Sequence, residues 1–276
     1  MGAGVIGSGI AQVTAQARYE VMVMDIEEEV LRRALGSIDK SLSKKVSKGS
    51  ISEDKKQEIL SHITTTTDIN GAKSADLVIE AIPEVMELKV KAFKELDAIC
   101  PKHTILASNT SSLPISAMAS ATKRQPKVVG IHFMNPVPVM KGVEIIAGRH
   151  TSNETLQTSK DFVRSLGKEP CEAVDYAGFI VSRILDAMMN EAFYCVMDGN
   201  KPEEVDRTIR TCCNFPMGPL ELCDLAGADI VYQGLETMRK EFGDRLYPAP
   251  LLVSMVRAGD LGRKTGRGFY NYAKEA

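Results

Sequence analysis

Two residues of this chain, His132 and Glu144, have the types and the spacing that suit general acid–base chemistry. His132 ends the apolar run 128–131, and Glu144 lies twelve positions later inside a second apolar run, 143–146. A carboxylate without a partner is costly in such a strand, and a histidine beside it would remove that cost. The carboxylate would in turn favour an imidazole that acts as a base. Each residue alone fits an ordinary structural role, His132 as a histidine at a strand end and Glu144 as a glutamate on an exposed edge. A catalytic interpretation of the pair therefore depends on the residues around it.

Those neighbours are five polar residues in a row, Ser108-Asn109-Thr110-Ser111-Ser112. They follow the apolar run 105–107, so in a parallel sheet they would lie at the carboxyl edge together with His132, beside the crevice where ligands bind. Ser111 could hold a substrate oxygen there, or it could cap a helix that begins near Pro114. For a serine taken alone, the helix cap is the better interpretation.

The start of the chain carries a phosphate-binding pattern. Residues 2–7 read GxGxxG, and Asp25 follows 18 residues later, after a helical run (8–17) and an extended run (21–24). Glycines let the backbone approach a phosphate, the helix N-terminus attracts the anion, and the acid accepts ribose hydroxyls. The predicted dinucleotide contacts are Gly2, Gly4, Val5, Ile6, Gly7 and Asp25.

The residues around Asp25 predict which dinucleotide is bound. Glu27, Glu28 and Glu29 follow it closely, and Met24 rather than an arginine precedes it. A 2′-phosphate would meet this acidic cluster without a compensating cation, so the sequence predicts NAD and not NADP.

One part of this pattern is missing from the sequence, because only Met1 precedes Gly2. The fingerprint usually follows a strand that is central in a doubly wound sheet. If that strand were absent, both strands next to it would lose hydrogen bonds. We therefore expect the natural chain to carry several more apolar residues upstream of Met1.

The elements that would position these residues alternate between strands and helices, which predicts an α/β fold with a Rossmann-type, mostly parallel, doubly wound sheet. Residues 27–61 are polar, long and broken at Gly49, with Ser52 as an N-cap, and they predict a helical hairpin inserted in that sheet. The strand pattern ends near residue 175. We expect an NAD-binding domain at 1–175 and an all-helical domain at 176–276. The predicted strands are 21–24, 77–79, 105–107, 128–131 and 143–146.

Composition narrows the classes of function. The chain has 276 residues, 44% hydrophobic and 25% charged, with a net charge of −2, so no basic field attracts nucleic acid or an anionic membrane. No apolar run approaches the ~20 residues of a membrane span. The six cysteines show no metal-binding spacing and suggest buried thiols of a reducing compartment, which predicts a cytoplasmic protein without a bound metal.

At this point the chain resembles a known family, the short-chain L-3-hydroxyacyl-CoA dehydrogenases, and most closely their bacterial 3-hydroxybutyryl-CoA branch. The resemblance covers essentially the whole chain, and six blocks in one order make it specific. It rests on residues 2–12, 108–113, 132–141, 178–181, 216–219 and 262–266.

The resemblance implies roles for individual residues. His132 would take the proton of the 3-hydroxyl while a hydride leaves C3, Glu144 would orient His132, and Ser111 would bind the substrate oxygen near the nicotinamide. Further cofactor contacts would come from Glu84, Lys89, Ser111, Asn135 and Lys264. Ser41 and Lys48, about two helical turns apart, match positions that touch coenzyme A.

One departure from the family bears on activity. The family usually has an asparagine in the motif that opens its helical domain, and this chain has Ser182 there. A lost donor aimed at developing charge can cost ~10²-fold in rate. Two alternatives stay open: the same fold acting on a free hydroxy acid, which would not need Ser41 and Lys48, or a non-catalytic NAD-binding relative. The resemblance also implies a homodimer formed through the helical domain.

Overall fold

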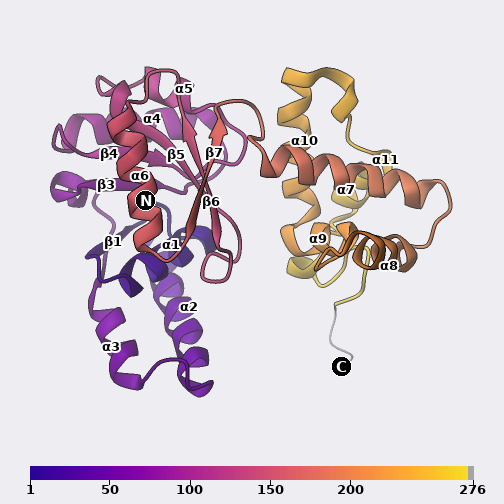
Figure 1. Ribbon diagram of the computed structural model, residues 1–276, viewed down its shortest axis with the longest axis horizontal. Helices are drawn as coiled ribbons and strands as arrows, with labels where there is room; N and C mark the ends of the chain where they lie inside the picture. The colour runs from indigo at the N-terminus through magenta and orange to yellow at the C-terminus, as the bar shows by residue number, and fades with distance from the viewer. Residues whose placement is uncertain (273–276) are drawn as a thin grey trace. The chain divides into compact units, whose positions relative to one another are not determined.

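The computed structural model describes residues 1–272 of the chain. The chain divides into two compact units. The first comprises residues 1–110 and 114–175, and the second comprises residues 111–113 and the segment from 176 onward. Figure 1 shows the strands gathered in the first unit and helices in the second.

The first unit contains two sheets. Strands β1 (Val21–Met24) and β2 (Ile63–Thr66) form a parallel pair. The second sheet has five strands in sequence order, and all its pairs are parallel except the antiparallel β5–β6 pair. Its strands are β3 (Leu77–Glu80), β4 (Ile105–Ser108), β5 (Val128–Phe133), β6 (Gly142–Ala147) and β7 (Glu169–Val174).

Helices cover these sheets and bury their apolar side chains. Helix α6 packs on β5, β6 and β7, α5 packs on β5, and α1 packs on β1 and α2. The buried core of the larger sheet includes Val129, Ile131 and Ile145, each at most 1% exposed. The helices of this unit are α1 (Val5–Gln16), α2 (Glu28–Ser47), α3 (Glu53–Ser61), α4 (Met86–Ile99), α5 (Ile115–Ser120) and α6 (Asn153–Ser165).

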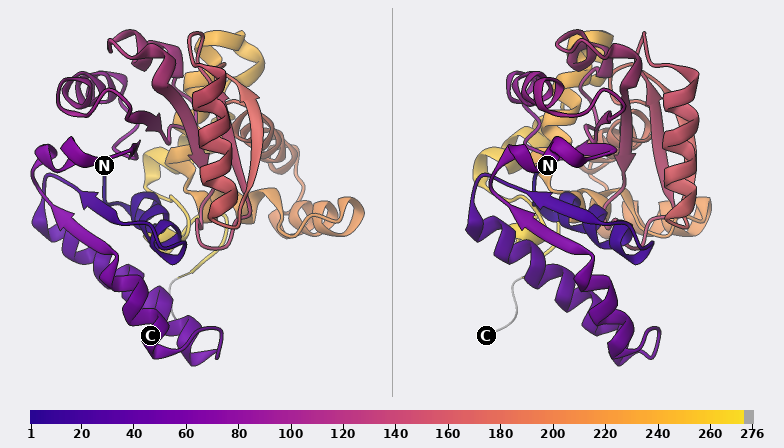
Figure 2. Two further views of the ribbon diagram at one scale, coloured as in Figure 1. Left: turned by 60° about the vertical axis from the view of Figure 1, so that its left-hand side comes forward. Right: turned by 90° about the vertical axis from the view of Figure 1, so that its left-hand side faces the viewer.

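The predicted helical hairpin is confirmed by α2 and α3, which extend together from the β1–β2 pair (Figure 2). Gly49 lies between them at φ 67°, and the hydroxyl of Ser52 caps α3 by accepting from the backbone N–H of Lys55 at 3.1 Å. The ammonium of Lys56 lies 2.7 Å from Asp39 and ties the two helices together. The side chain of Lys56 is 11% exposed and that of Asp39 is 50% exposed, so the pair lies at the edge of the contact between the two helices.

The sequence predicted five strands, and the structure adds β2 and β7. Both were missed because neither has an apolar run. β2 reads Ile-Thr-Thr-Thr with two exposed threonines, and β7 contains Pro170 and four exposed residues. The helical run expected at 8–17 begins three residues earlier, at Val5.

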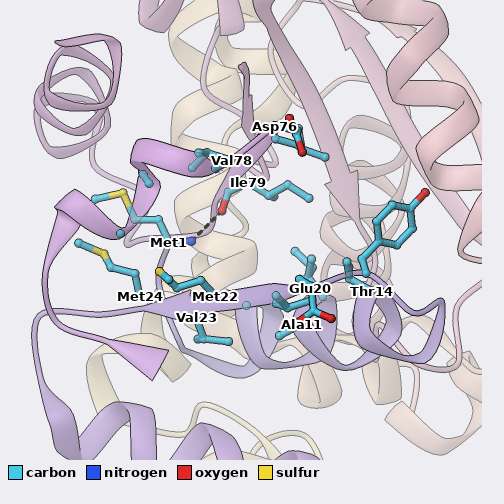
Figure 3. Close-up of a pocket in the computed structure, with 18 of the residues that line it drawn as sticks. Met1, Ala11, Thr14, Glu20, Met22, Val23, Met24, Asp76, Val78 and Ile79 are labelled. Carbon is cyan, nitrogen blue, oxygen red and sulfur yellow. Dashed lines mark hydrogen bonds between the residues drawn. The ribbon is translucent and has the colours of Figure 1, made fainter. Parts of the chain in front are cut away.

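The structure contains a cavity of about 700 Å³ between β1 and β3 (Figure 3). Residues of both strands line it, and no hydrogen-bonded ladder joins β1 to β3. Met1 lies at one end of the cavity, where its amino group donates to Ile79 O at 2.9 Å and its carbonyl accepts from Ala81 N at 2.8 Å. Gly2 N donates to Met24 O at 2.8 Å, so residues 1 and 2 bridge the two sheets. The upstream extension stays a prediction.

The second unit is helical throughout its described part, apart from two isolated β-bridges at 262–271. Its core includes Phe193, Leu220, Leu235 and Leu252, which are all fully buried. Its helices are α7 (Val181–Met197), α8 (Pro202–Cys213), α9 (Pro219–Ala226), α10 (Ala228–Phe242) and α11 (Pro250–Ala258).

The cysteine prediction was partly wrong. All six are free thiols, but only Cys100 and Cys223 are buried, while Cys171, Cys212 and Cys213 are exposed. Within residues 1–272, no helix is both long and apolar enough to cross a membrane.

Candidate active site

The adjacent strands β5 and β6 bring His132 and Glu144 together. The two residues are directly opposite in the antiparallel register, and His132 Nδ1 lies 2.8 Å from Glu144 Oε2. His132 is 7% exposed and Glu144 is 2% exposed, so the hydrogen bond forms where water competes little. The predicted histidine–glutamate pair is therefore confirmed as a structural unit. With Nδ1 facing the carboxylate, Nε2 is the ring nitrogen on the side away from Glu144.

Asn109 links this pair to the neighbouring strand end. The side-chain oxygen of Asn109 accepts from the backbone N–H of Phe133 at 2.8 Å, and the backbone N–H of Asn109 donates to the backbone carbonyl of Glu80 at 2.8 Å. The residue after β4 is thereby fixed beside the residue that follows His132. The polar segment 108–110 and His132 lie at the same edge of the sheet, as the sequence predicted.

Ser111 does not serve as the cap of α5. The backbone N–H groups of Ile115 and Ser116 donate instead to the carboxylate of Asp175, both at 2.8 Å. The helix-cap interpretation of Ser111 was therefore wrong, and its hydroxyl is not needed at the start of that helix. Ser111 itself is half-buried and belongs to the segment 111–113 that groups with the second unit.

The glycine-rich turn has the shape that a phosphate-binding loop needs. Gly2 has φ 90°, and a Cβ there would lie 2.5 Å from Ala81 O. A Cβ on Gly7 would lie 1.9 Å from Gly2 O, so both positions exclude any larger residue. Gly4 differs, because a Cβ there would meet nothing within 4 Å. It caps α1 without any side chain, which leaves open space at the helix N-terminus for an anion.

Asp25 is fixed against this turn. Its Oδ2 accepts from Ala3 N at 2.8 Å, and its Oδ1 lies 3.4 Å from Glu27 N. The carboxylate at the end of β1 is thus held beside the glycine turn, where the fingerprint requires an acceptor for ribose hydroxyls. The turn, the uncapped helix N-terminus and the acid together fit a dinucleotide.

Glu84 and Lys89 lie at the carboxyl edge of β3 and β4, and a third residue joins them. The ammonium of Lys89 lies 2.6 Å from Glu80 Oε1 and 3.2 Å from Glu84 Oε2. Lys89 and Glu80 are each 1% exposed, whereas the side chain of Glu84 is 31% exposed. Of the two predicted cofactor contacts, Glu84 reaches the surface and Lys89 is enclosed.

The remaining predicted contacts are distributed over both units. Asn135 is exposed just after β5, Ser41 is half-buried on α2, and Lys48 is exposed at the end of α2. Ser182 is the second residue of α7 in the second unit. Lys264, also in that unit, pairs with both carboxylate oxygens of Asp229, at 2.5 and 2.6 Å. The described residues hold no group of three or more His, Cys, Asp or Glu side chains that could bind a metal.

Comparison with known families decides what these features belong to. A family model described as "3-hydroxyacyl-CoA dehydrogenase, NAD binding domain" matches residues 1–176, and "3-hydroxyacyl-CoA dehydrogenase, C-terminal domain" matches residues 178–272. The chain belongs to the 3-hydroxyacyl-CoA dehydrogenase family. Its cofactor is NAD, in agreement with the glycine turn and Asp25.

Individual relatives agree over nearly the full length. The chain is 45% identical to the "Probable 3-hydroxybutyryl-CoA dehydrogenase" of Bacillus subtilis over 99% of this chain and 96% of that protein. It is 46% identical to the "3-hydroxybutyryl-CoA dehydrogenase" of Clostridioides difficile, over 99% and 98%. Among solved structures, the (S)-3-hydroxybutyryl-CoA dehydrogenase of Ralstonia eutropha matches with a TM-score of 0.93 at 41% identity, covering 99% of this chain and 97% of that chain.

Sequence reasoning missed Glu80 as a member of this region. The signal was present, because Glu80 ends the apolar run Leu77-Val78-Ile79, much as Glu144 interrupts its own run. A carboxylate next to buried strand residues needs a partner, and the same argument that paired Glu144 with His132 applies here. What the sequence did not indicate is which of the many lysines would supply that partner.

Proposed function

We propose that this protein interconverts a 3-hydroxyacyl-CoA, with 3-hydroxybutyryl-CoA as the reference substrate, and the corresponding 3-oxoacyl-CoA. In the oxidative direction, the C3–H bond delivers a hydride to the nicotinamide of NAD⁺ and the hydroxyl oxygen loses its proton. The observation that carries the proposal is the buried His132–Glu144 pair at the carboxyl edge of a sheet whose glycine turn fits a dinucleotide.

His132 acts as the general base in this proposal. Its Nε2 accepts the hydroxyl proton in oxidation and returns it to the carbonyl oxygen in reduction. The imidazolium that forms is stabilised by the carboxylate of Glu144, 2.8 Å from Nδ1. Because both residues lie opposite each other in a strand pair, the ring is held in one orientation without a loop movement.

The proposed cofactor contacts follow the edge of the sheet. Asp25 accepts the ribose hydroxyls, and the glycine turn with the first residues of α1 (Gly2, Gly4, Val5, Ile6, Gly7) contacts the pyrophosphate. Glu84, Lys89, Asn135, Ser111 and Lys264 are proposed to contribute on the nicotinamide side. The acidic surroundings of Asp25 support NAD rather than NADP.

The coenzyme A end of the substrate is proposed to bind along α2. Ser41 and Lys48 lie about two turns apart on that helix, and the exposed ammonium of Lys48 suits a phosphate as a point charge. Ser111 and Ser182 are proposed to bind the reacting oxygens. Because Ser182 is shorter than the asparagine of related sequences, its contact with the substrate is expected to be weaker.

A homodimer and a cytoplasmic location complete the proposal. Two large apolar side chains of the second unit, Ile184 and Ile230, are 61% and 53% exposed, and such side chains are commonly covered by a second copy. Light scattering at micromolar concentration tests the dimer, and a monomeric mass contradicts it. The six free cysteines support a reducing compartment.

The test of function uses acetoacetyl-CoA and NADH, with the loss of NADH absorbance as the readout. We expect turnover with NADH and much lower catalytic efficiency with NADPH. Lys48→Ala separates the substrate classes, because it should raise KM for acetoacetyl-CoA by about tenfold while leaving small free hydroxy acids unaffected. Lys44→Ala, on the neighbouring exposed position of the same helix, is the matched control. NADH binding without any turnover would contradict the enzymatic proposal.

A further inference from the structure

A buried polar cluster centred on Glu80 lies at the carboxyl edge of the larger sheet. Oε1 of Glu80 accepts from Ile82 N at 2.7 Å and from the Lys89 ammonium at 2.6 Å. Its Oε2 accepts from the hydroxyl of Ser108 at 2.7 Å. One carboxylate therefore connects the ends of β3 and β4, the crossing segment 81–85 and helix α4.

Lys89 is held entirely by protein groups. Its three N–H donors have three acceptors within reach, Glu80 Oε1 at 2.6 Å, Ile82 O at 3.2 Å and Glu84 Oε2 at 3.2 Å. The ammonium is 1% exposed. A lysine in this setting acts on its surroundings through the groups that it holds and not through a free charge at the surface.

Glu84 is the member of the cluster that extends to the surface. Its side chain is 31% exposed, its Oε2 faces Lys89, and its Oε1 accepts from the hydroxyl of Thr110. Thr110 N in turn donates to Ser108 Oγ at 3.2 Å, and Ser108 is bonded to Glu80. The carboxylate of Glu84 is therefore oriented from two sides by residues that Glu80 organises.

Burying the carboxylate of Glu80 together with the ammonium of Lys89 is an inefficient way to stabilise a core, because the desolvation of the two charges offsets most of their attraction. Apolar residues of similar volume would pack as well at the ends of β3 and α4. The position of the cluster explains its charge better, since it lies directly at the strand ends that form the ligand crevice of such a sheet.

We propose that Glu80 is a positioning residue for the dinucleotide: it holds Lys89 and Ser108 so that Glu84 presents its carboxylate to the cofactor. Lys89 then acts on the cofactor through Glu84. This inference rests on the proposed cofactor site at the same edge of the sheet, and it adds a residue to which the sequence assigned no role.

A double-mutant cycle tests the proposal, with NADH affinity measured by fluorescence titration and turnover measured at saturating NADH. Glu80→Gln removes the charge with little change in shape, and should raise the Kd for NADH by about tenfold while changing kcat by about twofold or less. Glu84→Gln should raise the Kd by a similar factor. Because Glu80 acts through Glu84, the double variant should bind NADH no more weakly than Glu84→Gln alone. Glu80→Asp, which keeps the charge, should recover part of the affinity.

A structural control comes from the opposite end of α4. Asp97 lies 2.6 Å from Arg124 Nε and is 12% exposed, so Asp97→Asn also breaks an enclosed ion pair of the same helix. It should lower the melting temperature and leave the Kd for NADH unchanged. If Glu80→Gln behaves in the same way, or if the two losses of affinity in the cycle add in full, Glu80 is only structural and the proposal is overturned.

A less disruptive variant keeps the test valid if Glu80→Gln does not fold. Ser108→Ala removes one hydrogen bond from Glu80 and keeps the ion pair, and it should weaken NADH binding in the same direction by a few fold. An unchanged Kd in Ser108→Ala, with Glu80→Gln insoluble, counts against the proposal. Absence of NADH binding by the wild-type protein would instead contradict the proposed function, so the two failures are distinguishable.

Discussion

Two buried carboxylates of the same sheet, Glu144 and Glu80, hold bases of different kinds. Glu144 is 2% exposed and contacts the imidazole of His132, the type of side chain that most often serves as a general base. Glu80 is 1% exposed and contacts the ammonium group of Lys89. In the proposed mechanism the first pair takes part in proton transfer, whereas the second pair orients the carboxylate of Glu84. The proposals therefore assign different roles to two carboxylates of similar burial.

A third carboxyl, Asp186 on α7, shows what happens without a basic partner. Asp186 has no hydrogen-bond or ion-pair partner among the described residues. Its Oδ2 packs against Gly234, where an added Cβ would lie 2.4 Å from that oxygen. Burial raises the pKa of Asp186 from 3.8 to about 7. Glu144 and Glu80 differ from Asp186 in having a basic side chain within hydrogen-bond distance of the carboxylate.

The largest effect should come from the group that exchanges the proton. His132→Gln keeps a polar side chain opposite Glu144 and removes the base, so kcat should fall by about 10³-fold. The Kd for NADH should stay within about twofold of the wild-type value, because the glycine turn and Asp25 are untouched. Steady-state kinetics with acetoacetyl-CoA and fluorescence titration measure the two quantities. A variant that keeps most of its turnover would remove the mechanism proposed for this site.

Glu144→Gln should lower kcat by on the order of 10²-fold, because the amide cannot stabilise the imidazolium and can favour the wrong tautomer. The comparison with Glu80→Gln sharpens the contrast between the two carboxylates. We expect the first variant to act on kcat and the second on NADH affinity. Equal effects of both variants on kcat would show that the two carboxylates do not differ in the way proposed.

The sequence predicted much of this site because its signals are local. The glycine turn, Asp25 and the histidine–glutamate pair each combine a residue type with a short spacing, and the structure places each in the expected element. Glu80 was missed although Lys89 lies only nine positions away, because the chain offers many lysines as partners for a buried carboxylate. Residue spacing alone does not indicate which lysine turns inward.

The fold was likewise predicted only where the signal lies within a single segment. Strands with apolar runs were found, whereas β2 and β7 were not, because β2 carries three threonines and β7 contains a proline and two glutamates. Their strand character comes from pairing with β1 and β6, and pairing is a property of the sheet and not of the segment. The capping of α5 by Asp175 could not be predicted from the sequence either, because Asp175 is 60 positions from Ile115.

Asp186→Asn should stabilise the protein in a pH-dependent way. Because the pKa of Asp186 is raised, the folded chain keeps a proton that the unfolded chain releases, so its contribution to stability falls between about pH 4 and pH 7. Asparagine does not ionise. The variant should match the wild type near pH 4 and exceed it by about 2 kcal/mol above pH 7, less than the full shift would give because the residue is not fully buried. Urea unfolding at both pH values measures this, and an equal difference at the two would contradict it.

The smallest effect should come from an exposed carboxylate with the same contact distance as Glu80. Glu172 on β7 lies 2.6 Å from the ammonium of Lys160, and Glu80 lies 2.6 Å from that of Lys89. Glu172 is 68% exposed, however, so water screens its charge and the pair contributes little. Glu172→Gln should change the free energy of unfolding by less than about 0.5 kcal/mol and leave NADH affinity unaltered. A loss in the Glu172 variant as large as that of Glu80→Gln would mean that distance, and not burial at the strand ends, determines what these ion pairs do.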